Sequence, residues 1–408
     1  MKKILVTFFS AATISASLWA LTAASTDAGS IMMNDSYDPI EYKILVESAG
    51  EVQKEKNAFA PGVNDGELSA ENQYPEPDGD VYPEPSKINL NIPGLNHELT
   101  QKYIELYQSK ENSSWLAQSL VNSAPYRPYI RQKLAEKNMP SYLQYLPVIE
   151  SNYKITAVSK SGARGMWQFM DNSMAPLLKK SSWYDQRYDP WLETDAALIK
   201  LMDNYKMFGD WNLAIAAYNC GGGAMRRLLK AHPKADFWYL AEHNLLRTET
   251  KLYVPKLLAV AELVENAEYY GLINVGVADK MIEFTEIEEF DYVKISGVLT
   301  MEQLSQIVDV NVETLKFLNP SLLKGMTPPE QFEIRLPHGK GEAAEAALRK
   351  ADIPNNTLNY TVQKGDNLSV ISRKFDVTID EICKINQISR DSILSIGQVL
   401  TIPVYDPE

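Results

Sequence analysis

Apolar residues recur at helical spacing through residues 97–271, and this pattern limits the fold more than any other feature of the sequence. The segment from Asp195 to Phe208 carries apolar residues on nearly all sides of a helix, and the shorter segments Leu213–Tyr218 and Pro255–Val264 do the same. A helix that is apolar all round must be buried among other helices. We therefore expect this stretch to form an all-α domain that is large enough for a core of its own.

The sequence after this stretch contains an internal repeat. Residues 304–310 (LSQIVDV) align with residues 371–377 (ISRKFDV), and further on Asn319 aligns with Asn386. Both copies have the order strand, helix, helix, strand, so the chain is predicted to be multidomain, with small α+β modules after the helical domain. The segment between them is rich in Ala, Glu and Lys and fits a helical or flexible connector. We place the first copy at 289–338, the connector at 339–358 and the second copy at 359–404.

The first residues have the composition of an export signal. Met1-Lys2-Lys3 is basic, residues 4–21 are apolar or small without any acidic residue, and small residues follow up to Ala24. These features favour a signal peptide at 1–24 that is cleaved after Ala24. The alternative is an uncleaved anchor, because the apolar run nearly reaches the roughly 20 residues that span a bilayer. In both cases we expect an exported protein of the periplasm or cell envelope, which the anchor would hold at the membrane.

Residues 25–96 are acidic and rich in Pro, Asn and Gly, and they contain the near-repeat YPEP at 74–77 and 82–85. Proline fixes φ and removes a backbone donor, so we expect an extended linker that precedes the helical domain. The alternative is a polyproline ligand for a partner protein.

Charge and cysteine content exclude several classes of function. The chain of 408 residues has 40 basic and 53 acidic side chains, and its net charge of −13 argues against a nucleic-acid partner held through phosphates. Cys220 and Cys383 fall in different modules, so neither a disulfide framework nor a cysteine-rich zinc site is expected. The histidines form no HExxH motif, and neither His232 nor His243 has an evident orienting partner for a thiol peptidase that would use Cys220. We expect no metal and no cofactor.

One carboxyl group in the helical stretch has unusual neighbours. Glu150 ends the apolar run QYLPVIES at residues 144–151, with aromatic and aliphatic residues on nearly every side. Burial disfavours the charged form, so this side chain should keep its proton at a higher pH than a free glutamic acid. A general acid that protonates an ether-like leaving group needs that property. The alternative, on this segment alone, is a glutamate at the solvent side of a helix end.

The string GARGMWQF at residues 162–169 adds groups that suit a saccharide. Its glycines flank a tight turn and permit close approach of the backbone. Met166 and Trp167 are expected to offer apolar faces to sugar rings. Gln168 can form hydrogen bonds with an acetamido group.

Two further strings follow in the same domain. In AYNCGGG at residues 217–223, a glycine C-cap ends a helix and should leave Tyr218 and Asn219 exposed at the turn. The string ETKLYVP at residues 249–255 leads into the last predicted helix.

Taken together and in this order, the four strings resemble the soluble-lytic-transglycosylase domain of the goose-lysozyme-like superfamily, from about residue 140 to residue 264. With the repeat downstream, the chain is similar to the MltD-type membrane-bound lytic murein transglycosylases. The resemblance implies a lysozyme-like all-α fold that cleaves the β-1,4 bond between N-acetylmuramic acid and N-acetylglucosamine in peptidoglycan. It also implies an anhydro-muramic acid end, because the sugar's own hydroxyl closes on the anomeric carbon in place of water.

The resemblance implies a role for each matching residue. Glu150 would protonate the glycosidic oxygen and then, as the carboxylate, take a proton from the primary hydroxyl of the muramic acid. Ser151 and Tyr253 would orient Glu150 or the substrate. With peptidoglycan glycan strands as the partner, the substrate-binding residues would be Gly165, Met166, Gln168, Tyr218 and Asn219.

Two alternatives stay open at this point. A hydrolytic muramidase on the same fold would use a second carboxylate, and Asp189 in the string WYDQRYDPW at residues 183–191 is the candidate. The favoured interpretation of that loop is an ion-pair network of Asp185, Arg187 and Asp189 before a helix that starts at Glu193, with Trp183 and Trp191 packed inside. The second alternative is a non-catalytic cell-wall-binding protein.

The second copy of the repeat resembles the LysM family over its whole length, and the resemblance implies a βααβ fold that binds N-acetylglucosamine-containing glycans between two loops. Asp366 is also placed to cap the first helix. The first copy has Val298-Leu299 in place of the Gly-Asp turn, so it resembles a degenerate LysM that can be structural only. Cys383 is expected to be an unpaired packing residue. The implied glycan-binding residues are Gly365, Asp366, Asn367, Leu368, Ser392, Ile393 and Leu394.

Overall fold

The computed structural model describes residues 85–284, 289–351 and 357–403. The expected signal peptide at 1–24 and most of the expected linker at 25–96 lie outside these residues. Within these residues, every helix is too short or too polar to span a membrane.

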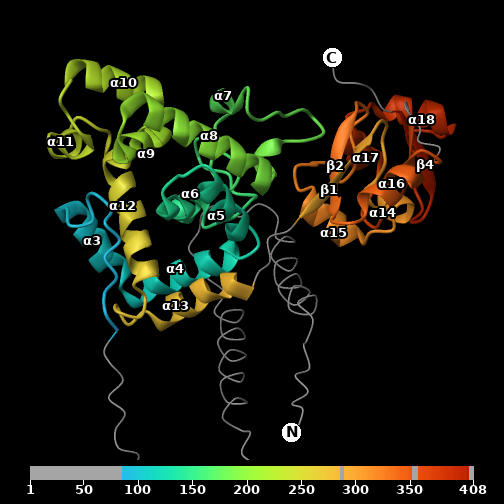
Figure 1. The fold of residues 1–408 in the computed structure, drawn as a ribbon. Coiled ribbons are helices and arrows are strands. Elements are labelled where there is room, and N and C mark those ends of the chain that lie inside the picture. Colours follow the sequence, from blue (N-terminus) through green and yellow to red (C-terminus); the bar gives the residue numbers. More distant parts are fainter. Residues whose placement is uncertain (1–84, 285–288, 352–356, 404–408) are drawn as a thin grey trace, which may run out of the picture.

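Residues 97–284 form a helical domain, as the apolar spacing predicts (Figure 1). Most of its buried side chains belong to one continuous core. Its elements are α3 (Glu98–Tyr107), α4 (Lys110–Ser123), α5 (Arg127–Glu136), η1 (Ser141–Tyr145), α6 (Leu146–Ser151), α7 (Asp171–Met174), η2 (Gln186–Tyr188), α8 (Pro190–Phe208), α9 (Trp211–Cys220), α10 (Gly222–Ala231), α11 (Phe237–Glu242), α12 (Thr248–Glu265), α13 (Ile273–Lys280) and η3 (Met281–Phe284).

The long helix α12 lies against α3, α6 and α9, and most of its side chains are buried. It begins at Thr248, so it includes the string ETKLYVP, which the sequence placed ahead of the helix. Pro255 stands inside α12, where it removes one backbone donor, and the helix continues through it because the surrounding core holds both halves. The string therefore presents its side chains from a helix, at fixed positions.

Local sequence signals set the bounds of α8. The carboxylate of Asp189 caps the helix by accepting the backbone N–H groups of Trp191 and Leu192, and Pro190 occupies its first position. Gly209, with a φ of 70°, ends it. The helix starts three residues before Glu193, the expected first residue, because the Asp-Pro pair supplies the cap and the first helical residue.

The two copies of the repeat have the predicted strand, helix, helix, strand order, each with two antiparallel strands. In both copies one asparagine joins the second helix to the last strand. Asn319 exchanges hydrogen bonds with the backbone of Arg335, and Asn386 does the same with Thr401. The first copy has β1 (Phe290–Ile295), α14 (Met301–Val308), α15 (Val312–Leu318) and β2 (Phe332–Pro337), and the second has β3 (Thr357–Thr361), α17 (Leu368–Phe375), α18 (Ile379–Asn386) and β4 (Val399–Pro403).

The expected connector contains a helix, α16 (Gly341–Leu348), which belongs to the first copy. Ala344 and Leu348 are buried in the core of that copy, and the backbone N–H of Gly341 donates to Asp291 at 2.6 Å. Residues 341–348 of the expected connector are thus helical and pack on the module before them, and residues 357–358 belong to strand β3. Below, the first copy means residues 289–351 and the second copy residues 357–403.

Candidate active site

Glu150 is the next-to-last residue of α6, whose end is fixed by side chains from another helix. Asn152 follows in the left-handed conformation, with a φ of 55°, and closes the helix. Trp115 Nε1 donates to the side-chain oxygen of Asn152 at 2.7 Å, and Asn122 Nδ2 donates to its backbone oxygen at 3.0 Å. Both donors belong to α4, so this helix holds the end of α6 two residues after the candidate acid.

Glu150 is half-buried as a residue, and protein atoms surround its carboxyl group on nearly every side. Burial raises the pKa of Glu150 to about 7, and the negative charge of Glu249 acts in the same direction. The hydroxyl of Tyr253, which donates to Glu150 Oε1, opposes this shift, and so does the charge of Lys200. The raised pKa agrees with the expectation from the apolar run. A carboxyl group of this kind can hold a proton near neutral pH and can also release it.

Glycine at position 165 is required by the close approach of another chain segment. Gly165 has a φ of 85°, and a Cβ there would lie 1.9 Å from the backbone oxygen of Arg187. Arg164 and Phe169 exchange two backbone hydrogen bonds of 3.0 Å and close a tight turn over residues 165–168. The predicted turn is therefore present, and it is pressed against the segment that precedes α8.

Met166 and Trp167 do not face a substrate, contrary to the expectation from the sequence. Both side chains are completely buried. Trp167 Nε1 donates to Thr194 Oγ1 of α8 at 2.9 Å, and the backbone oxygen of Trp167 accepts the hydroxyl of Tyr218 at 2.9 Å. The turn directs these side chains into the core, so Met166 can contribute to the site only through its backbone.

Tyr218 is buried as well, so its predicted exposure is wrong, although Gly221 does end α9 with a φ of 87°. The phenol lies beneath the turn because its hydroxyl bonds to Trp167. Asn219 is half-buried and faces α12: its side-chain oxygen accepts from Thr250 Oγ1 at 2.7 Å, and its Nδ2 lies 3.4 Å from Glu249 Oε1.

Gln168 and Ser151 both form hydrogen bonds with the backbone of the turn. Gln168 is partly exposed, and its Nε2 donates to the backbone oxygen of Gly165 at 2.7 Å. Ser151 Oγ donates to the backbone oxygen of Met166 at 2.8 Å. Ser151 thus ties the end of α6, and with it the neighbouring Glu150, to the turn.

Two charged residues near this centre were missed by the sequence reasoning, Glu193 and Lys200, both on α8. Glu193 is 0% exposed, and its carboxyl group lies under the turn, since a Cβ on Gly165 would come within 2.4 Å of Glu193 Oε1. Burial raises the pKa of Glu193 well above its usual range, and the backbone N–H groups of Trp167 and Met166 oppose that shift. Among the described residues, neither carboxyl oxygen has a partner in ordinary hydrogen-bond geometry. Full burial prevents Glu193 from touching a sugar.

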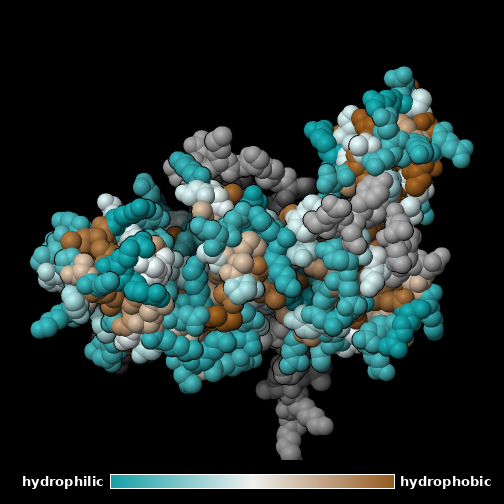
Figure 2. All heavy atoms as spheres, turned by 90° about the horizontal axis from the view of Figure 1, so that it is seen from above, coloured by the Kyte–Doolittle hydropathy of each residue, from teal (hydrophilic) through white to brown (hydrophobic). Residues whose placement is uncertain are grey.

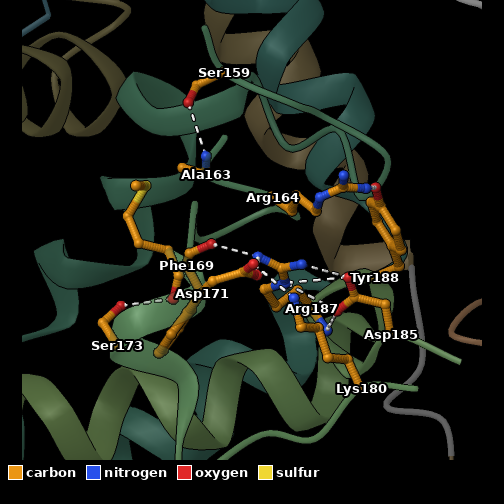
Figure 3. A network of polar contacts seen from close by, with 11 residues as sticks. Ser159, Ala163, Arg164, Phe169, Asp171, Ser173, Lys180, Asp185, Arg187 and Tyr188 are labelled. Atoms are coloured by element: carbon orange, nitrogen blue, oxygen red, sulfur yellow. Dashed lines mark hydrogen bonds and ion pairs between the residues drawn. The ribbon is translucent and has the colours of Figure 1, made fainter. Parts of the chain in front are cut away.

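The loop before α8 contains an ion-pair network, as its sequence predicts. Figure 3 shows the guanidinium of Arg187 between the carboxylates of Asp171 and Asp185, at 2.5 and 2.6 Å. Asp189 is buried against Arg335 of the first copy at 2.7 Å. Trp183 and Trp191 are buried too, as expected. Asp189, the candidate second carboxylate of a hydrolytic muramidase, therefore forms a buried ion pair with Arg335.

The predicted glycan-binding residues of the second copy fall into two groups. Ile393 is 94% exposed, Gly365 and Asn367 are exposed, and Asp366, Ser392 and Leu394 are half-buried. Leu368 is buried in the core of the copy, so its side chain does not contribute to a surface. Figure 2 shows hydrophobic side chains at the surface of the lobe on the right, which the C-terminal part of the chain forms.

The expected cap of α17 is corrected by one residue. Asn367, not Asp366, caps the helix, and its side-chain oxygen accepts from the backbone N–H of Val370 at 2.9 Å. The carboxylate of Asp366 instead accepts from the hydroxyl of Tyr360 and the N–H of Gln363, at 2.7 and 2.8 Å. Adjacent Asp and Asn can both cap a helix, and the turn at Gly365 decides which one does.

Both cysteines are free thiols. Cys383 is buried in the core of the second copy, as expected for a packing residue. Burial raises the pKa of Cys220, which disfavours the thiolate that a thiol peptidase requires.

A pocket of about 520 Å³ lies away from this centre, between the segment at residues 90–93 and the start of α9. Its walls include the stacked rings of Tyr205 and Trp211. None of the predicted site residues lines it.

Three family models match the chain. Residues 128–241 match the transglycosylase SLT domain. Residues 289–353 match the model described as lytic transglycosylase MltD, LysM-like domain, and residues 360–403 match the LysM domain. The two copies of the repeat thus match different models.

Known proteins resemble the chain over different lengths. The membrane-bound lytic murein transglycosylase D of Escherichia coli strain K12 is 31% identical over 349 residues, which cover 80% of this chain and 73% of that protein. A putative tributyltin chloride resistance protein of Alteromonas sp. strain M-1 is 37% identical over 121 residues, 28% of this chain and 58% of that protein. A crystal structure of the 70 kDa soluble lytic transglycosylase of Escherichia coli aligns with a TM-score of 0.31 and 20% identity, over 46% of this chain and 32% of that one.

Proposed function

Because the chain belongs to the family of MltD-type lytic murein transglycosylases, which are peptidoglycan-acting lyases, we propose that Glu150 is its catalytic acid and base. The bond cleaved is the β-1,4 linkage between N-acetylmuramic acid and N-acetylglucosamine, and the product carries an anhydro-muramic acid end. The observation that carries the proposal is a single carboxyl group with a pKa raised to about 7 and a phenol in contact with it.

The reaction needs one proton donor and one proton acceptor in sequence. Glu150 first gives its proton to the glycosidic oxygen, and the bond from that oxygen to the anomeric carbon of the muramic acid breaks. The carboxylate then takes the proton of the muramic acid's primary hydroxyl, whose oxygen forms the new bond to the anomeric carbon. Glu150 ends protonated as it began, and no water is consumed.

The neighbours of Glu150 fit both halves of this cycle. Burial and the charge of Glu249 keep the proton on Glu150 before cleavage. Tyr253 and Lys200 favour the carboxylate, so they stabilise the charge that appears once the proton has left. Ser151 holds α6 to the turn and so keeps Glu150 in place, while Gln168 and Asn219, both partly exposed, would contact the sugars.

The second copy would hold the enzyme on its substrate through the loops that contain Gly365 and Ile393. Ile393 and Ile396 are both largely exposed, and exposed apolar residues that lie together mark an interaction surface. Since murein lies outside the cytoplasm, the proposal also places the protein in the cell envelope, in agreement with the expected signal at residues 1–24.

Product analysis tests the reaction. Purified sacculi are digested with the wild type, with Glu150→Gln, and with the matched control Glu136→Gln, which changes an exposed carboxylate on α5. We expect the wild type and the control to release muropeptides one water lighter than hydrolysis products and resistant to borohydride reduction. Glu150→Gln should bind sacculi without cutting them. Reducible products would show a hydrolytic muramidase, and sacculus binding without any wild-type turnover would show a cell-wall-binding protein.

The pH profile tests the acid role separately. Glu150 must carry its proton when the bond breaks, so turnover should be retained below pH 7 and fall as pH rises through about 7, where this group ionises. Initial rates on sacculi between pH 5 and pH 9 measure this limb. A rate that rises through that range would contradict the assignment of Glu150 as the acid.

A further inference from the structure

We propose that the first copy is a clamp on the helical domain and that its Arg335 is a positioning residue for the centre around Glu150. The copy would act on turnover through α8 and would not bind glycan itself. The inference uses turnover by the proposed function as its readout, and its basis is a set of contacts between the two parts of the chain.

The central contact is a buried ion pair. Arg335, on β2, lies with Nη1 2.7 Å from Asp189 Oδ2 and Nη2 3.2 Å from Asp189 Oδ1, and both side chains are about 5% exposed or less. The guanidinium also lies over the ring of Trp191, at 4.8 Å from its centre. Asp189 is the cap of α8, so an arginine from the first copy holds the residue that starts this helix.

Backbone contacts add a second attachment. Residues 183–185 of the helical domain run beside residues 321–323 of the first copy. The N–H of Leu323 donates to the oxygen of Trp183 at 2.8 Å, and the N–H of Asp185 donates to the oxygen of Ser321 at 2.9 Å. Trp191 also packs edge-on against Phe290 and Phe317 of the first copy.

The first helical turn of α8 connects the ion pair with the residues around Glu150. Glu193 and Thr194 follow the cap by one turn, and both face the tight turn at residues 165–168. That turn accepts the hydroxyl of Ser151, the neighbour of Glu150. A shift of the start of α8 would therefore reach Glu150 through two further contacts, each between buried or half-buried groups.

The two loops of the first copy are bonded to each other at the place where the LysM resemblance implies a groove in the second copy. Leu299 and Thr327, which lie on its two loops, bond to each other: the N–H of Leu299 donates to Thr327 Oγ1 at 2.8 Å, and the N–H of Thr327 donates to the oxygen of Leu299 at 2.9 Å. The N–H of Met301 likewise donates to the oxygen of Gly325 at 3.1 Å. The described residues of the second copy show no such bonds between residues 365–368 and 392–395.

The test compares variants in the full chain. Arg335→Met removes the charge at similar length, and Arg335→Lys keeps it. Arg349→Met is the matched control, because the partner of Arg349 among the described residues is Glu345, on the surface of the same copy. Turnover and KM are measured on soluble glycan strands, and binding is measured by co-sedimentation with sacculi. All measurements are made at a temperature where circular dichroism shows each variant to be folded.

We expect Arg335→Met to lower kcat on the order of 10- to 100-fold, with KM and sacculus binding unchanged. Arg335→Lys should recover part of the loss, and Arg349→Met should match the wild type. In hydrogen exchange, Arg335→Met should expose amides of residues 191–194 and 165–168 but not those of α9. If Arg335→Met does not fold, Asp189→Asn replaces it, because asparagine keeps the cap but not the charge.

Wild-type kcat in folded Arg335→Met or Asp189→Asn protein would overturn the inference. So would a loss of kcat that Arg335→Lys does not relieve, or one matched by an equal loss of sacculus binding. If Glu150→Gln stays active, the proposed function fails, while the comparison of Arg335 variants with the wild type still decides whether the clamp exists.

Discussion

The two copies of the βααβ repeat share their internal framework and differ in what their loops contact. Each has an asparagine, Asn319 or Asn386, that bonds the second helix to the last strand. The loops of the first copy bond to each other and to the helical domain, whereas those of the second copy keep Ile393 almost fully exposed. A small fold can therefore keep its framework while its loops differ, forming an exposed surface in one copy and a domain interface in the other.

The difference comes from a few positions outside the shared framework. Arg335 of the first copy corresponds to Thr401 of the second, at the same place on the last strand. Val298 and Leu299 are buried where the second copy has the exposed turn at Gly365. Val298 is buried in one cluster with Trp183 and the core of the second copy, and Arg335 pairs with Asp189 of the helical domain, so both positions join the first copy to its neighbours.

The largest expected difference is between Arg335→Met and Thr401→Met. The first substitution leaves Asp189 as an unpaired buried charge, and we expect it to lower the free energy of unfolding by about 3–5 kcal/mol. The second changes a half-exposed position and should stay within about 0.5 kcal/mol. Urea unfolding followed by fluorescence measures both. Similar losses in the two copies would remove the distinction drawn here.

The equivalent asparagines should differ by a smaller amount. Asn319→Ala removes the hydrogen bonds that the side chain forms with the buried backbone N–H and oxygen of Arg335, which should cost about 2–3 kcal/mol. Asn386→Ala should cost about 1 kcal/mol, because Asn386 is half-exposed and water can replace its amide. The same unfolding experiment compares them, and a greater loss for Asn386→Ala would argue against a tighter first copy.

A binding measurement separates the loop surfaces. Ile393→Asp should weaken sacculus binding about tenfold, equal to roughly 1.4 kcal/mol, because it puts a charge on the exposed apolar surface of the second copy. Leu323→Asp is the matched control, since Leu323 is 50% exposed on the first copy. Both are made with Glu150→Gln to prevent digestion and are measured by co-sedimentation. Equal weakening by the two changes would mean that the first copy binds glycan as well.

The smallest expected loss of stability is the same in both copies. Thr300 and Thr378 each begin a helix with a complete capping box, one in each copy. Replacing either by Ala should cost about 1 kcal/mol. Matching losses in thermal unfolding would show that local capping is the same in both copies and that the contrast lies in their contacts. A difference of several kcal/mol would mean that the contrast between the copies lies within their helices.

The sequence predicted the features that depend on local spacing. The helical domain, the two strand–helix–helix–strand modules and the raised pKa of Glu150 follow from apolar periodicity and from the alignment of Asn319 with Asn386. Each of these features lies within one element or one short motif. Its surroundings are determined by neighbours along the chain, so it can be predicted from a single sequence.

Features that depend on packing between distant elements were missed. Trp167 and Tyr218 were expected at a surface, and the packing of the turn against α8 and α9 buries them. Glu193 follows a helix start, where an acidic residue normally faces solvent and favours the helix dipole, and nothing nearby shows that it is buried. Arg335 and Asp189 are 146 positions apart, so no spacing rule connects them.

Because Arg335 and Asp189 form a buried pair, the first copy cannot be replaced by another domain as freely as the second. Replacing the second copy by another wall-binding domain keeps the pair of Arg335 and Asp189, although it uncovers Trp183, Val298 and Met326, which are buried in one cluster with the core of the second copy. A chain cut after Gly271, where the apolar helical pattern stops, would uncover the ring of Trp191 and leave the carboxylate of Asp189 without its cation. The shortest autonomous catalytic fragment therefore extends to about residue 351, and an engineer who shortens this enzyme should trim it from the far end.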